Sequence, residues 1–113
     1  MNDLVQLYMN SLKTLGDILI AMTTPEWDAM MQTKTAEERT AAAMEMLKVQ
    51  QARLTLANAA LSSIAAELKA NEAPLKKGID QVNKALDRFD NVDKILKGIA
   101  AVVSTISRIV PLV

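Results

Sequence analysis

The sequence predicts an all-α fold, arranged as an elongated antiparallel three-helix bundle. Half of the 113 residues are hydrophobic, and they recur at alternating steps of three and four residues, which places them on one face of a helix. Only three Gly and three Pro occur, so the turns must be few. The length suits one helical-bundle domain over residues 1–113, and the absence of Cys excludes disulfides.

A first apolar seam predicts a helix over about residues 2–22. Its members follow one another at steps of four and three, as in a coiled coil: Met1, Val5, Tyr8, Leu12, Leu15, Leu19 and Met22. Pro25 cannot donate a backbone hydrogen bond to the preceding turn, but it suits the first position of a new helix that Thr24 would cap. We therefore expect a short linker helix over residues 25–32.

A capping box marks the start of the next helix, because Thr35 is followed three residues later by Glu38. The seam beyond it predicts one long helix over residues 36–71. The members of this seam are Ala36, Thr40, Ala43, Leu47, Gln50, Leu54, Ala57, Leu61, Ile64 and Leu68. Its small residues would let a partner helix approach closely. Gln50 would either be buried and fix the register of the two helices or, more simply, lie at the solvent-exposed edge of their contact.

Pro74 predicts a tight turn near residues 70–74, and a last helix follows over residues 74–109. The alternating steps of four and three are interrupted after Phe89, because the next apolar residue, Val92, follows at a second step of three. This interruption indicates either a local distortion or a break near residues 89–92. We expect a continuous helix with a distortion, because Asp90–Lys94 and Asp93–Lys97 are well-spaced ion pairs across that point. Pro111 would end the helix.

The lengths of these segments favour one arrangement. At 1.5 Å per residue, the helices over 36–71 and 74–109 would each span about 54 Å. A turn of a few residues between two matched helices predicts an antiparallel hairpin. The N-terminal helix, with the short linker helix, would lie alongside as the third member of the bundle.

The composition argues against several classes of function. Without His and Cys, the chain lacks the commonest general base and the commonest metal ligands. Its 13 basic and 13 acidic residues balance, whereas nucleic-acid-binding proteins normally carry a basic excess. The mixed charges between Lys76 and Arg88 are typical of a solvated surface, and the isolated glycines form no phosphate loop. We therefore expect no enzyme, no catalytic, cofactor-binding or metal-ligating residues, no small-molecule substrate and no nucleic-acid partner.

Two groups of residues are candidate interfaces. The first combines the only tryptophan with methionines, whose flexible side chains suit adaptable binding surfaces: Trp27, Met30, Met31, Met44 and Met46. This group would form either a partner-binding patch or, as the simpler interpretation, the apolar end of the bundle core.

The second group lies in the C-terminal segment, where residues 94–113 hold three basic and no acidic side chains. Its candidate interface residues are Ile99, Val102, Val103, Ile106 and Ile109. A basic amphipathic helix with a wide apolar face is typical of a membrane-surface or partner-binding segment. The alternative is ordinary packing within the bundle or at an oligomer interface.

The sequence as a whole favours a non-enzymatic interaction or assembly protein. Apolar residues outside single seams predict homo-oligomers, most simply a dimer, or binding to a protein partner. The alternative function is membrane association through residues 94–113. Because no signal peptide or transmembrane segment is evident in the sequence, we expect a cytoplasmic protein.

Overall fold

The computed structural model describes residues 2–110, and this part of the chain folds into helices without any strand. The helices are α1 (Asn2–Ala21), α2 (Pro25–Met31), α3 (Ala36–Asn58), α4 (Leu61–Ala70), α5 (Glu72–Arg88) and α6 (Val92–Ile109). The prediction of an all-α fold is confirmed. Met1 of the first predicted seam and residues 111–113, including Pro111, lie outside the described residues.

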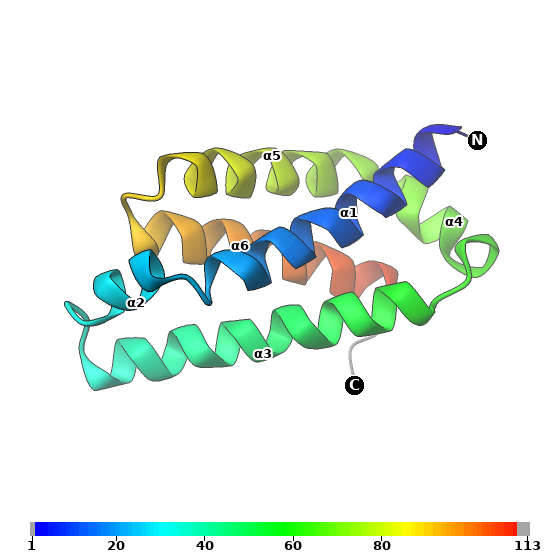
Figure 1. The fold of residues 1–113 in the computed structure, drawn as a ribbon. Helices are drawn as coiled ribbons and strands as arrows, with labels where there is room; N and C mark the ends of the chain where they lie inside the picture. The colour runs from blue at the N-terminus through cyan, green and yellow to red at the C-terminus, as the bar shows by residue number, and fades with distance from the viewer. Residues whose placement is uncertain (1, 111–113) are drawn as a thin grey trace.

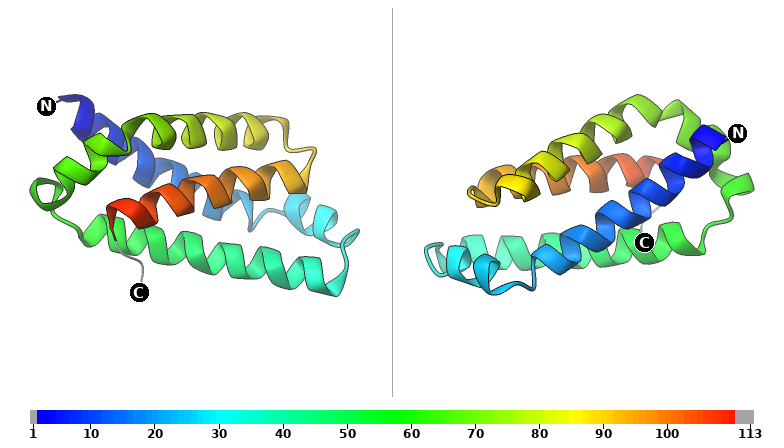
Figure 2. Two further views of the ribbon diagram at one scale, coloured as in Figure 1. Left: turned by 180° about the vertical axis from the view of Figure 1, so that it is seen from behind. Right: turned by 45° about the horizontal axis from the view of Figure 1, so that its top comes forward.

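The molecule measures 44 × 28 × 18 Å. Its longer helices α3, α5 and α6 extend along its length, and α1 crosses them obliquely (Figure 1). Figure 1 shows α2 at one end of this arrangement and α4 at the other. Helix α6 lies between α5 and α3, as the view from behind in Figure 2 also shows, and it packs against α3, α4 and α5. The core therefore centres on α6, whose buried residues are Val92, Ile95, Gly98, Ile99, Val102, Val103, Thr105, Ile106 and Ile109.

Local capping signals act as the sequence predicts. The Thr24 hydroxyl accepts a hydrogen bond from the Trp27 N–H at 3.2 Å, and Pro25 occupies the first turn of α2. Thr35 and Glu38 form the predicted capping box, in which each accepts a hydrogen bond from the other's backbone N–H at 3.1 Å. These caps fix where α2 and α3 begin.

The predicted long helix over residues 36–71 is wrong, because the chain breaks between α3 and α4. Ala59 and Ala60 are extended there, and the Tyr8 hydroxyl of α1 donates a hydrogen bond to the Leu56 carbonyl at 2.9 Å. A continuous helix would turn Ile64 about 80° away from the face that buries Leu56. The break reorients α4, so that Ile64 is buried in the same core.

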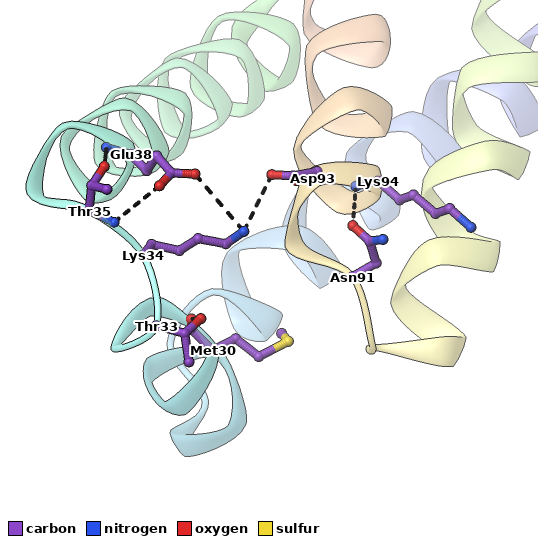
Figure 3. Close-up of polar contacts among 8 residues, drawn as sticks. All are labelled: Met30, Thr33, Lys34, Thr35, Glu38, Asn91, Asp93 and Lys94. Carbon is purple, nitrogen blue, oxygen red and sulfur yellow. Dashed lines mark hydrogen bonds and ion pairs between the residues drawn. The ribbon is translucent and has the colours of Figure 1, made fainter.

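The predicted continuous helix over residues 74–109 is also wrong. Phe89 ends α5 in the left-handed conformation (φ 49°, ψ 41°), and Asn91 caps α6 by accepting a hydrogen bond from the Lys94 N–H at 3.1 Å. Instead of pairing with Lys97, Asp93 forms an ion pair with Lys34 at 3.7 Å. Figure 3 shows the two side chains pointing toward each other. The antiparallel hairpin is therefore α5–α6. Over residues 2–110 the structure has four longer helices and two short ones in place of the predicted three-helix arrangement.

Candidate functional site

The N-terminal candidate residues mostly pack into one end of the core. Trp27 and Met31 are buried, while Met30 and Met46 are half-buried against the core. The rings of Trp27 and Phe89 pack edge to face, with their centroids 6.4 Å apart. Met44 differs, because 54% of its surface is exposed on α3. The structure thus leaves one member of this group open to solvent.

The C-terminal candidate residues all lie inside the bundle. Ile99, Val102, Val103, Ile106 and Ile109 are buried in the hydrophobic core. The basic residues Lys94, Lys97 and Arg108 remain exposed on the opposite side of α6. Among the described residues, no helix combines the length and the apolar character that crossing a bilayer requires.

Helix α3 carries two apolar faces instead of one. Its inner face is buried and consists of Ala42, Val49, Ala52 and Leu56. Its other face is the seam predicted from the sequence, and every member within α3 is exposed: Ala36, Thr40, Ala43, Leu47, Gln50, Leu54 and Ala57. We call these seven residues the outer seam. The expectation that the outer seam faces the other helices of the bundle is wrong.

The two faces of α3 carry different side chains. The inner face offers mainly alanine and valine, so α1 and α6 can pack closely against it. The larger Leu47 and Leu54 point to the opposite side of α3, where 59% and 65% of their surfaces are exposed. Both faces repeat every seven residues, so periodicity alone could not separate them. The heptad through Ala42, Val49 and Leu56 was the available signal for the inner face.

The outer seam is presented on a rigid helix. The capping box holds the start of α3, and the Tyr8 hydroxyl binds the Leu56 carbonyl at its end. Between these points the inner face anchors α3 to α1 and α6. Leu47 and Leu54 are therefore large apolar side chains held on one line of α3 at the surface, and the exposed Met44 lies beside Leu47.

The described residues offer few groups for chemistry. They contain no cluster of three His, Cys, Asp or Glu side chains able to hold a metal ion, and no buried side-chain polar atom among them lacks a hydrogen-bond partner. Two buried hydroxyls donate hydrogen bonds within their own helices, Ser11 to the Leu7 carbonyl at 2.7 Å and Thr105 to the Ala101 carbonyl at 2.9 Å. In comparisons with protein-family models, curated proteins and solved structures, the chain has no match.

Proposed function

We propose that this chain is a non-enzymatic assembly protein that self-associates through the outer seam of α3. The observation that carries the proposal is the exposure of Leu47 and Leu54, which lie seven residues apart on one face of α3, with Met44 exposed beside them. Single exposed apolar side chains are ordinary in proteins, whereas a row at coiled-coil spacing is the pattern that a second helix packs against.

The energetics favour docking on this surface. Burying a Leu or Met side chain contributes about 1.5–3 kcal/mol, so three such residues supply a useful part of a binding free energy. Helix α3 is already folded and anchored along its inner face, so little conformational entropy is lost when a partner docks. Obligate interfaces are usually larger than one helix face, and we therefore expect a reversible dimer at micromolar concentration.

The alternation of large and small residues supports an antiparallel pair about a two-fold axis. In that arrangement Leu54 of one copy faces Ala43 of the second copy, and Leu47 faces Gln50, so that each layer joins a large and a smaller residue. A parallel pair would instead place leucine on leucine and alanine on alanine, which spaces the helices unevenly.

Membrane association through residues 94–113 has less support. Within the described part of this segment, the apolar side chains that would enter lipid belong to the core of the bundle or pack against it, so α6 would have to leave its neighbours to expose them. That exposure would cost much of the stability of the fold.

The test of self-association uses the double variant Leu47→Asp/Leu54→Asp and the control variant Ile20→Asp. Ile20 is 66% exposed on α1, outside the outer seam, so the control adds a carboxylate at an equally open apolar position. Light scattering at micromolar concentration should give a mass above the 12.3 kDa of one chain for the wild type and the control. The double variant should be monomeric with an unchanged circular dichroism spectrum. A monomeric wild type would refute the proposal.

The orientation can be tested by cross-linking, because the chain has no cysteine. In an antiparallel pair Thr40 lies opposite Ala57 of the second copy. A mixture of Thr40→Cys and Ala57→Cys chains should therefore form mixed disulfides more readily than either variant alone. Efficient disulfide formation by Thr40→Cys alone would indicate a parallel pair, without affecting the conclusion on self-association.

A further inference from the structure

A cleft of about 550 Å³ lies between α5 and α6, and its lining is strongly cationic. The lining residues are Gln81, Lys84, Ala85, Asp87, Arg88, Lys94 and Lys97. Four positive side chains and one carboxylate give this lining a net charge of +3, whereas the whole chain is neutral. The α5–α6 hairpin therefore concentrates positive charge at one place on the surface.

Most of these cations have no ion-pair partner among the described residues. Lys84 forms an ion pair with Asp80 at 3.1 Å, but Arg88, Lys94 and Lys97 form no ion pair within residues 2–110. Placing like charges around one cleft is electrostatically unfavourable, and a bound anion would relieve the repulsion.

The position of Lys94 supports a role other than stabilising the fold. It is the third residue of α6 and lies in the first turn, where the helix macrodipole favours negative rather than positive side chains. Figure 3 shows that the Lys94 side chain extends from α6 toward α5, while the neighbouring Asp93 turns the other way toward Lys34. A residue that opposes a local preference without a compensating contact is typical of a functional site.

We propose that this cleft binds a ligand with two or more adjacent phosphate groups. Adjacent phosphates would let one ligand contact Arg88 from α5 together with Lys94 and Lys97 from α6. The planar guanidinium of Arg88 can bind a phosphate with two hydrogen bonds, and the lysines add point charges. The volume of the cleft falls within the usual range for small-molecule sites.

Inorganic triphosphate is the probe for this site, titrated by calorimetry at low ionic strength in a buffer without other polyvalent anions. The wild type should bind it, and the double variant Lys94→Gln/Lys97→Gln should bind it at least about fivefold more weakly. The control is Lys76→Gln/Lys77→Gln, which removes the same amount of charge from exposed positions of α5 outside the cleft. The control should retain most of the affinity, and orthophosphate should bind more weakly than triphosphate.

Two results would overturn the proposal. One is the absence of triphosphate binding by the wild type at millimolar concentration, and the other is an equal loss of affinity in both double variants. Flotation with vesicles containing phosphatidylinositol bisphosphate distinguishes the source of the phosphates. Flotation that the Lys94→Gln/Lys97→Gln change abolishes would assign the cleft to lipid headgroups, whereas binding of free triphosphate without flotation would assign it to soluble ligands. All variants change exposed side chains, so an unchanged circular dichroism spectrum should confirm their fold.

Discussion

Gly98 of α6 lies directly against Val82 of α5. A Cβ atom at position 98 would be 3.0 Å from both the Cα and the Cβ atoms of Val82. A second close approach follows along the same pair of helices, where a Cβ atom at Gly78 would be 3.2 Å from a methyl group of Val102. Two glycines, one on each helix, thus allow α5 and α6 to pack closely enough to form the central hairpin.

We predict that Gly98→Ala destabilises the protein. The added methyl group meets the backbone of α5, which cannot move without shifting the whole helix, and such overpacking costs about 1–3 kcal/mol. The higher helix propensity of alanine offsets part of this loss, by about 1 kcal/mol. Gly16→Ala is the matched control, since its Cβ would only touch the Arg53 side chain at 3.6 Å. Denaturant unfolding at one protein concentration should show a loss of stability for Gly98→Ala and a gain for Gly16→Ala.

Phe89 provides a second prediction, because it combines an unfavourable backbone with a favourable side-chain contact. Its left-handed conformation costs a non-glycine residue roughly 1 kcal/mol, while its ring packs against Trp27. Phe89→Gly loses the ring but adopts the left-handed conformation freely, whereas Phe89→Ala loses the ring and keeps the backbone cost. Both variants should be less stable than the wild type, with Phe89→Gly more stable than Phe89→Ala by about 1 kcal/mol.

Unfolding followed by the fluorescence of Trp27, the only tryptophan, measures this difference. Both variants should also shift the emission of the native state, because each removes the Phe89 ring. Equal stability of the two variants would show that the backbone conformation at position 89 carries no cost.

The sequence predicted the helical class and several helix starts because these depend on local chemistry. Thr24, Thr35 and Glu38 cap helices through neighbours within a few residues. The break at Ala59 and Ala60 was missed because alanine is the strongest helix former, and the Tyr8 contact that stabilises the break comes from far along the chain.

The outer seam and the cationic cleft could not be located from the sequence, because both depend on how the helices pack. The inner face and the outer seam of α3 both have heptad spacing, so either could face the core. Which one does depends on how closely α1 and α6 pack against α3. The cationic cleft exists because the turn at Phe89 folds α6 back along α5, which brings Lys94 and Lys97 beside Lys84 and Arg88. A continuous helix over that region could not bring these residues together.

The capping box makes a prediction about pH. The backbone N–H of Thr35 donates a hydrogen bond to the Glu38 carboxylate at 3.1 Å, and this bond, with smaller contributions from the Thr35 side chain and Lys34, lowers the pKa of Glu38. Because the pKa of Glu38 is lower in the folded state, its contribution to stability is present above the ordinary carboxyl value. That contribution is lost as the pH falls through the pKa of the folded state.

Thermal unfolding of the wild type and Glu38→Gln between about pH 3 and pH 6 checks this sign. The variant keeps a hydrogen-bonding side chain without the titratable charge, so its stability should fall less steeply as the pH is lowered. In addition, an NMR titration should find a higher pKa for Glu38 in Thr35→Ala than in the wild type. A Glu38 pKa that does not change would argue against this role of the Thr35 hydroxyl.

The last prediction compares a core residue of α6 with a residue of the outer seam of α3. Ile99 is fully buried at the centre of the bundle, whereas Leu47 is 59% exposed on the outer seam. Ile99→Asp places a carboxylate in the hydrophobic core, which costs more than about 4 kcal/mol and should largely unfold a protein of ordinary stability. Leu47→Asp should change the stability of the monomer by no more than about 0.5 kcal/mol, because its new charge remains in water. Circular dichroism and denaturant unfolding at low concentration measure both effects, and a folded Ile99→Asp variant would contradict the placement of α6 in the core.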